Sequence, residues 1–244
     1  MSVSPVADPW ALVRQLVGDR VEERELAVGP FLTDQLLNAP RHLLFVLSRY
    51  KFAARLLPPL ETVDVLELGC GEGFGSLLLS ERGHRVLGVD SDADAIEVAR
   101  RTVGAPNRRF EAADFLGKRF GASRAVVSLD VIEHIPAELE NAFFQTVLAN
   151  LSDDGICIIG TPNANASAYA SPQSQVGHVN LYTAERLAGA IGRYFQNTFV
   201  FGMNDEVVHT GFYPMCHYLF VMGTGKRPQA AEPPRPIKRL RPLR

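Results

Sequence analysis

The sequence predicts an α/β fold with a doubly wound, mostly parallel sheet and an antiparallel C-terminal hairpin at one edge. Two observations support this. Between residues 63 and 160, short apolar runs typical of buried strands alternate with stretches whose apolar residues recur at helical spacing. Such alternation is typical of right-handed strand–helix–strand units. After residue 192, two strand-like runs follow each other without a helical pattern between them, which favours antiparallel pairing.

Composition and charge narrow the class of protein. The 244 residues are 46% hydrophobic and 21% charged, which suits one large globular domain with appended elements. The net charge of −2 gives no overall attraction to nucleic acid or to an anionic membrane. Cys70, Cys157 and Cys216 lack metal-site spacing, and neither a signal peptide nor a membrane span is apparent. We expect a cytoplasmic protein.

Residues 1–57 are expected to form a helical segment that covers the binding site. A short helix is predicted near Trp10–Val17. From Arg41 to Leu57, apolar residues recur at helical spacing until Pro58 and Pro59 end the pattern, as in an amphipathic helix. Because this helix is basic, it suits either packing on the sheet or contact with a membrane surface.

The main domain is expected over residues 58–222. Its parallel strands are predicted at Val63–Leu68, Arg85–Asp90, Arg108–Ala112, Ala125–Leu129 and Gly155–Gly160. The helices are predicted at Gly75–Arg82, Ala93–Arg101 (with Ser91 or Asp92 as N-cap), Ala137–Asn150 and Ala184–Gly192. The closing hairpin is predicted from Thr198–Met203 and Tyr213–Met222. Residues 223–244 are basic and proline-rich, so we expect a disordered tail that either solubilises the chain or contacts nucleic acid, anionic lipid or a partner.

The strongest motif is the glycine-rich turn after the first strand, in VDVLELGCGEGFGS. Glycines allow a sharp turn and close approach of a ligand. The dinucleotide pattern GxGxxG fails, because its last glycine would fall on Phe74 or Ser76, and no lysine follows as in a phosphate-binding loop. The carboxylates of Glu67 and Glu72 would repel a pyrophosphate. The turn therefore favours a cationic ligand without phosphates.

Two acids follow the next strands. Asp90 ends RVLGVD, where a carboxylate can accept hydrogen bonds from the two hydroxyls of a ribose. Asp114 ends FEAAD, where it either accepts from an adenine amino group or caps a helix.

With these motifs, residues 63–160 resemble the class I S-adenosylmethionine-dependent methyltransferases, which have a Rossmann-like fold. ELGCGEG resembles the first motif of that family, GVD and AAD its ribose and adenine acids, and SLDVIEHI its fourth-strand motif. The resemblance implies S-adenosylmethionine as cofactor, held by Glu67, Gly69, Gly71, Gly73, Asp90, Asp114, Phe115 and the backbone near Asp130.

Two histidines are candidate catalytic bases for a hydroxyl acceptor. His134 follows the fourth strand, and His178 lies in the long polar loop after the fifth strand, the kind of loop that often forms a lid or binding loop. Each histidine also has a purely structural interpretation. The same loop offers Asn163, Asn180 and Tyr182 as possible acceptor contacts.

Two further clusters leave alternatives open. Asp130, Glu133 and His134 are similar to the D/E-x-x-E-H pattern of ubiquinone-pathway O-methyltransferases, whose acids can hold a divalent metal, but the segment also occurs in metal-free relatives; no metal is predicted. Asn204, Asp205, Glu206 and His209 lie between the last two predicted strands, and His217 lies within the second of them. They form either part of the site, with Asp205 and His209 near His178, or a solvated turn.

The sequence thus predicts an enzyme that transfers a methyl group from S-adenosylmethionine to a small-molecule acceptor such as a sugar, polyketide or phenol. Oxygen is favoured over nitrogen because of the histidines. The alternatives are methylation of a nucleic acid such as tRNA, supported by the basic tail alone, and a non-catalytic cofactor-binding subunit. An NAD-dependent oxidoreductase is least favoured, since the dinucleotide pattern fails.

Overall fold

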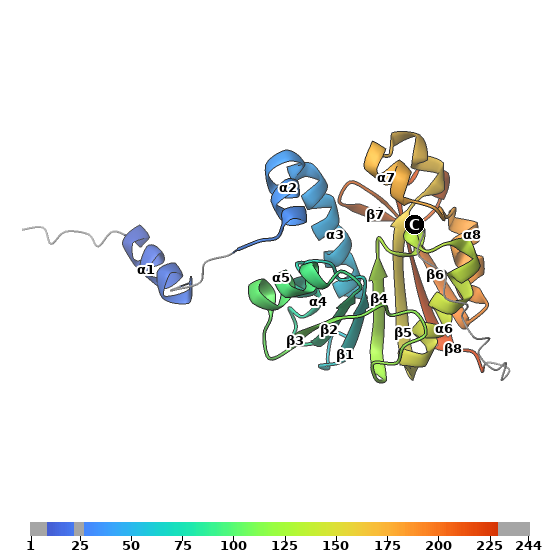
Figure 1. The fold of residues 1–244 in the computed structure, drawn as a ribbon, viewed down its shortest axis with the longest axis horizontal. Helices are drawn as coiled ribbons and strands as arrows, with labels where there is room; N and C mark the ends of the chain where they lie inside the picture. Colours follow the sequence, from blue (N-terminus) through green and yellow to red (C-terminus); the bar gives the residue numbers. More distant parts are fainter. Residues whose placement is uncertain (1–8, 22–26, 229–244) are drawn as a thin grey trace, which may run out of the picture.

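A computed structural model describes residues 9–21 and 27–228 of the chain. One eight-stranded sheet forms its centre, in the order β3-β2-β1-β4-β5-β8-β6-β7 (Figure 1). The strands are β1 (Asp64–Leu68), β2 (Arg85–Asp90), β3 (Arg108–Ala112), β4 (Ser123–Leu129), β5 (Leu151–Pro162), β6 (Phe195–Asn204), β7 (Val207–His209) and β8 (Tyr218–Lys226). The first five strands pair in parallel, and the last three pair antiparallel. The predicted α/β fold is confirmed.

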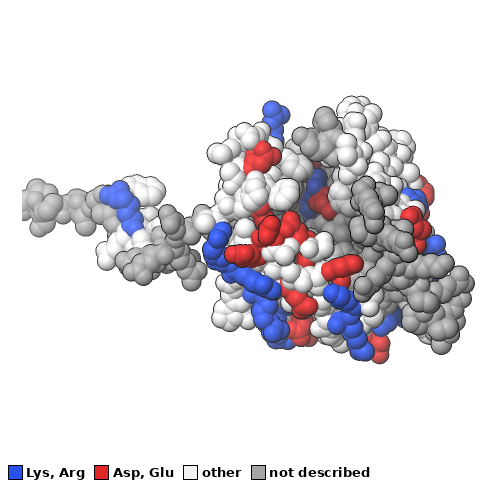
Figure 2. Space-filling view, viewed as in Figure 1, with Lys and Arg blue, Asp and Glu red and all other residues white. Residues whose placement is uncertain are grey.

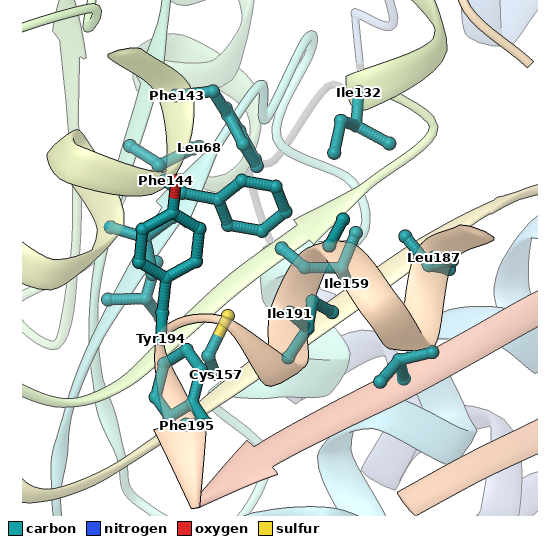
Figure 3. Close-up of a cluster of buried hydrophobic side chains, with 14 of the residues drawn as sticks. Leu68, Ile132, Phe143, Phe144, Cys157, Ile159, Leu187, Ile191, Tyr194 and Phe195 are labelled. Atoms are coloured by element: carbon teal, nitrogen blue, oxygen red, sulfur yellow. The ribbon is translucent and has the colours of Figure 1, made fainter. Parts of the chain in front are cut away.

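Helices cover both faces of the sheet. The helices are α1 (Pro9–Val21), α2 (Pro30–Asn38), α3 (Pro40–Leu56), α4 (Ser76–Leu79), α5 (Ala93–Val103), α6 (Glu140–Asn150), α7 (Pro172–Gly177) and α8 (Ala184–Gly192). Helices α6 and α8 bury Phe143, Phe144, Leu187 and Ile191 against one face (Figure 3). Helices α3 and α4 pack on the opposite face. Burial on both faces explains why the parallel strands read as continuous apolar runs.

The predicted antiparallel hairpin forms, since β6 and β8 pair antiparallel and lie with β7 at one edge of the sheet. Within this edge, β8 lies inside, between β5 and β6, and it is longer than predicted. It continues to Lys226, since its backbone pairs on both sides, for example Thr224 with Ile156 and with Asn197. The first four residues of the expected tail therefore belong to the sheet. Arg227 and Pro228 follow the strand, and residues 229–244 of the expected tail lie outside the described residues.

Several helix boundaries also differ. Helix α2, which has nine residues, follows a glycine and starts with Pro30, was not predicted from the sequence. Helix α4 ends at Leu79, earlier than expected, because tight turns follow it: the Glu81 amide donates to the Leu78 carbonyl at 3.3 Å and the Gly83 amide to the Ser80 carbonyl at 2.9 Å. The cap of α5 is Asp92, whose carboxylate accepts from the amides of Asp94 and Ala95. Tyr213–Met215 is a 3₁₀ turn rather than a strand, as Pro214 has no amide to donate.

The loop after β5 is partly helical. It contains a 3₁₀ segment, Ala164–Tyr169, followed by α7, which Ser171 caps. Figure 1 shows α7 beyond the ends of β4 and β5, across from α2 and α3. Among the described helices, none has the length and apolar character needed to cross a membrane.

Candidate functional site

A large cavity lies where the parallel strands end. Its volume is about 1190 Å³, above the usual range of roughly 300–1,000 Å³ for one small ligand. Its walls come from the glycine turn, from α2 and α3, and from the loop after β5. Figure 2 shows this hollow between the part that carries α2 and the part that carries α7, with charged side chains inside. Of the predicted site residues, Gly69, Gly71, Asp90, Phe115, Asp130, His134 and His178 line it.

The glycine turn needs its glycines for two different reasons. Gly69, Gly71 and Gly73 all have positive φ, at 79°, 51° and 75°, where other residues are strained. A Cβ on Gly69 would approach the Val131 side chain to 2.2 Å, whereas one on Gly71 would meet nothing within 4 Å. Gly73 faces inward, since its Cβ would come within 2.8 Å of the Phe110 ring. Gly71 therefore leaves open space at the cavity wall, whereas Gly69 and Gly73 allow close packing against Val131 and Phe110.

Glu67 lies beneath the turn and is not among the residues that line the cavity. It is 1% exposed, and the Ser76 hydroxyl donates to its Oε2. Burial raises the pKa of Glu67 to about 7, although hydrogen bonds from Ser76 and Tyr50 act in the opposite direction. The carboxyl group therefore links the turn to the start of α4 and to α3.

The two predicted cofactor acids have different surroundings. Asp90 lines the cavity, and its carboxylate accepts from the Gly71 amide at 2.8 Å and from the Asp92 amide at 3.0 Å. Asp114 is exposed and accepts from the Leu116 amide at 3.1 Å, as a turn cap does. Its neighbour Phe115 lines the cavity instead. Asp90 and Phe115 therefore line the same cavity, whereas Asp114 lies outside it.

Asp130 carries an ion pair that the sequence analysis did not predict. Both of its carboxylate oxygens accept from Nη1 of Arg49 on α3, at 2.8 and 3.0 Å. The guanidinium also lies 4.0 Å from the centre of the Tyr218 ring, a cation–π distance. The spacing Val46, Arg49, Ala53 puts Arg49 on one helical face with apolar residues, a signal that its side chain turns inward.

Both candidate bases lie at the cavity wall. The His134 and His178 ring centres are 5.0 Å apart, and Nδ1 of His134 lies 2.9 Å from the Gly177 carbonyl oxygen. Burial lowers the pKa of His178, and the neighbouring His134 lowers it further. A neutral imidazole at pH 7 can accept a proton.

Glu133 adds a buried acid beside the histidines. It is fully buried, and the Thr161 hydroxyl donates to its Oε2 at 2.9 Å, while Oε1 has no hydrogen-bond partner among the described residues. Burial, together with the nearby Asp130 carboxylate, raises the pKa of Glu133 well above its usual range.

One set of side chains has the geometry of a metal site. Ligand atoms of Glu133, His134 and His178 lie within 4.8 Å of one another, a mixture of oxygen and nitrogen that suits zinc-like divalent ions. Asp130, expected in such a site, already has both oxygens bonded to Arg49. The oxygen-rich set of Asp130, Glu133 and His134 is therefore not preformed.

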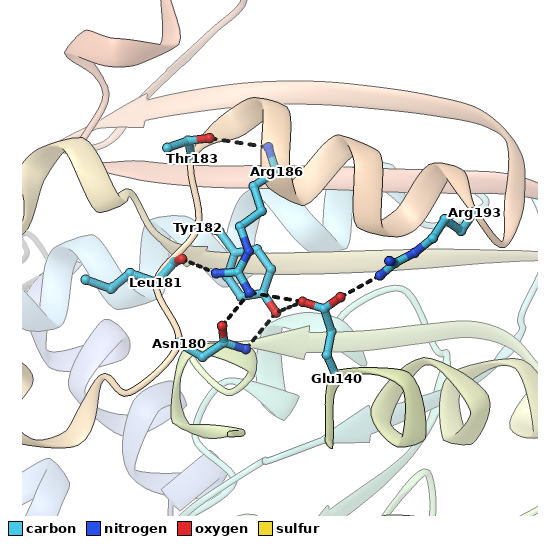
Figure 4. Close-up of polar contacts among 7 residues, drawn as sticks. All are labelled: Glu140, Asn180, Leu181, Tyr182, Thr183, Arg186 and Arg193. Atoms are coloured by element: carbon cyan, nitrogen blue, oxygen red, sulfur yellow. Dashed lines mark hydrogen bonds and ion pairs between the residues drawn. The ribbon is translucent and has the colours of Figure 1, made fainter. Parts of the chain in front are cut away.

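Asn180 and Tyr182, two of the expected acceptor contacts, bind other side chains of the protein instead. The Tyr182 hydroxyl donates to Glu140 at 2.7 Å and accepts from the Asn180 amide at 2.9 Å, and the Arg186 guanidinium lies 4.0 Å from the Tyr182 ring centre (Figure 4). Neither Asn180 nor Tyr182 lines the cavity. Both fix the loop to α6 and α8. Asn163 does reach the cavity wall.

Only part of the polar cluster predicted between β6 and β8 lies at the cavity. Asp205 and His217 line the cavity. His209 does not line it, and its Nε2 lies 3.4 Å from the Cys216 sulfur. His178 and Asp205 therefore line the same cavity, whereas His209 lies outside it.

Comparisons with known proteins identify the family of the chain. Residues 40–194 match a family model described as a methyltransferase domain. The 2-heptyl-1-hydroxyquinolin-4(1H)-one methyltransferase of Mycobacteroides abscessus is 34% identical over 93 residues, covering 35% of this chain and 40% of that protein. The ubiquinone biosynthesis O-methyltransferase of Arabidopsis thaliana is 30% identical over 158 residues, covering 59% and 47%. The chain thus spans less than half the length of these relatives.

Solved structures show the same fold. A TehB-like methyltransferase from Corynebacterium glutamicum has a TM-score of 0.58 at 19% identity, with 81% of this chain and all of that chain covered. The 1,6-didemethyltoxoflavin-N1-methyltransferase of Burkholderia thailandensis also has a TM-score of 0.58, at 18% identity, covering 93% and 94%.

Proposed function

Since the chain belongs to the methyltransferase domain family, we propose that it transfers a methyl group from S-adenosylmethionine to a hydroxyl oxygen of a small molecule. The products are a methyl ether and S-adenosylhomocysteine. S-adenosylmethionine is the cofactor of the chain.

The cavity residues divide into two groups that suit the two reactants. Asp90 accepts hydrogen bonds from the ribose hydroxyls, Phe115 contacts the adenine, and Gly69 and Gly71 admit the methionine part. A sulfonium and an ammonium are cationic, so the Asp90 and Asp130 carboxylates favour them. Arg49 pairs with Asp130 and presents a cation for the methionine carboxylate at the same place.

The observation that supports oxygen as the acceptor is His178. Its imidazole is held at the wall of the cofactor cavity, and its pKa is lowered. A methyl sulfonium is already activated, so alignment of the acceptor supplies most of the catalysis. A hydroxyl must also lose its proton, and a neutral imidazole accepts it. His134 lies beside His178 and stabilises the loop through the Gly177 carbonyl.

The relatives support the same acceptor class. One curated relative is named for a hydroxyquinolinone, and several are named ubiquinone biosynthesis O-methyltransferases. Apolar side chains from α2 and α3, including Phe31, Leu43 and Phe45, line the outer wall of the cavity. This wall suits an aromatic acceptor with apolar substituents.

A matched pair of acceptors tests the proposal. The enzyme is incubated with S-adenosylmethionine and either catechol or 1,2-diaminobenzene, and 2-heptyl-1-hydroxyquinolin-4(1H)-one serves as a second hydroxyl probe. We expect methyl ethers, identified by mass spectrometry together with S-adenosylhomocysteine. Methylation of the diamine alone would contradict the hydroxyl assignment while leaving the methyltransferase assignment intact.

A further inference from the structure

Helix α2 begins without a cap of its own. Its N-cap residue is Gly29, which has no side chain, and Pro30 has no amide hydrogen. The next two amides, those of Phe31 and Leu32, donate to Oε1 and Oε2 of Glu72, each at 2.9 Å. These amides would otherwise lack partners, and the helix dipole favours a carboxylate at this end. A residue forty positions away in the sequence therefore caps α2.

The absence of a side chain at Gly29 leaves space for the Glu72 carboxylate. A Cβ on Gly29 would lie 2.2 Å from Oε1 of Glu72, so any larger residue would push the carboxylate away. The φ of Gly29 is −80°, which any residue adopts, so the need for glycine here is one of space. The preceding segment is also attached to the body, since the Thr102 hydroxyl donates to the Ala27 carbonyl at 2.7 Å.

Glu72 belongs to the glycine turn that faces the cofactor. It lies between Gly71 and Gly73, both with positive φ, and the Gly71 amide donates to Asp90. Glu72, Phe31 and Leu32 all line the cavity. The turn therefore contacts the cofactor side of the cavity through its backbone and the α2 wall through one side chain.

We propose that Glu72 is a positioning residue that couples the cofactor site to the α2 wall of the acceptor site. A cofactor that fixes the glycine turn also fixes the Glu72 carboxylate, and with it the first turn of α2 and Phe31. The coupling is reciprocal, so the factor by which the bound cofactor stabilises α2 equals the factor by which the ordered α2 strengthens cofactor binding, and loss of the contact removes both. The proposal depends on the cofactor and is independent of whether the acceptor is a hydroxyl.

Hydrogen exchange of the peptide 27–39, with and without S-adenosylhomocysteine, measures this coupling. In the native chain we expect the product to slow exchange of this peptide by about fivefold, the factor that corresponds to one N-cap. In Glu72→Ala the exchange becomes faster, and the product no longer slows it, although peptides covering β1 and β2 are still protected. Glu97→Ala, on the exposed side of α5, is the matched control and should behave as the native chain.

A double variant separates positioning from simple helix stability. In Glu72→Ala with Gly29→Ser, the serine meets no carboxylate and supplies a cap within α2 itself. We expect this variant to recover slow exchange in α2 without the product, yet to gain no further slowing when the product binds. Its affinity for S-adenosylhomocysteine should stay about fivefold below that of the native chain. Full product-dependent slowing in either variant, or none in the native chain, would overturn the proposal.

Discussion

The titratable side chains in and beneath the cavity are held by specific neighbours, and these contacts determine which of them are free for chemistry. Asp130 is engaged by Arg49, and Glu67 is buried under the turn. His178 faces the cavity with a lowered pKa. One carboxylate oxygen of Glu133 has no hydrogen-bond partner in the part of the chain that the structure describes. The sequence predicted most of these residues from motif positions. It missed Arg49, because a long side chain from a distant helix has no local pattern that names its partner.

Replacing His178 by alanine should lower kcat on a hydroxyl acceptor by ~100-fold or more, the usual contribution of a general base. The affinity for S-adenosylmethionine should change little, since the base acts on the acceptor. Steady-state kinetics with calorimetry of cofactor binding separates the two effects. His209→Ala is the control, because that histidine does not line the cavity. Unchanged turnover in His178→Ala would remove His178 from the mechanism.

Metal removal tests the same residue independently. If His178 is the base, its imidazole cannot also be a metal ligand during turnover. Exhaustive treatment with a chelator should therefore leave the rate unchanged. A loss of activity that zinc or magnesium restores would instead assign Glu133, His134 and His178 to a metal site.

Glu67 predicts a specific pH dependence of stability. Its pKa is raised from 4.5 to about 7 in the fold, so the folded state binds a proton that the unfolded state releases. The contribution of Glu67 to stability is therefore largest below about pH 4.5 and falls as the pH rises towards 7 and above, by up to about 3 kcal/mol. Glu67→Gln should lack this decline, and its free energy of unfolding should increase relative to the native chain between pH 5 and about 8. Urea unfolding measures it, with Glu97→Gln as control; parallel curves for Glu67→Gln and the native chain would contradict the buried proton.

At the scale of elements, the sequence predicted what depends on local pattern and missed what depends on tertiary pairing. The parallel strands and α5 with its Asp92 cap follow from apolar runs and cap chemistry. The insertion of β8 between β5 and β6 has no local signal, because either neighbour suits an apolar strand. Helix α2 was missed because its stabilising cap comes from Glu72 rather than from the residues beside it.

The attachment of α3 should depend on Arg49. Arg49→Met keeps the apolar stem but leaves the Asp130 carboxylate without its partner, and Asp130 is only partly exposed. We expect a loss of about 1–3 kcal/mol in the free energy of unfolding. Arg41→Met, on the exposed side of the same helix, should change stability by less than about 0.5 kcal/mol. Equal stabilities of the two variants would show that the ion pair contributes nothing.

At the scale of the whole molecule, three parts of the chain meet around one cavity. The parallel strands supply the glycine turn, Asp90 and Asp130, the N-terminal helices α2 and α3 supply one wall, and the segment from β5 to α7 supplies the opposite wall. The cofactor half of this arrangement could be predicted because its motifs are contiguous in the sequence. The acceptor half could not, since it combines side chains from segments more than a hundred residues apart.

The most direct test of this account is calorimetric titration of the native chain with S-adenosylmethionine, S-adenosylhomocysteine and NAD. We predict that the first two bind with one site per chain and that Asp90→Ala weakens both by about tenfold or more, as loss of hydrogen bonds to a charged group does. NAD should not bind. Tight binding of NAD without binding of the other two ligands would contradict the assignment of the cavity as an S-adenosylmethionine site.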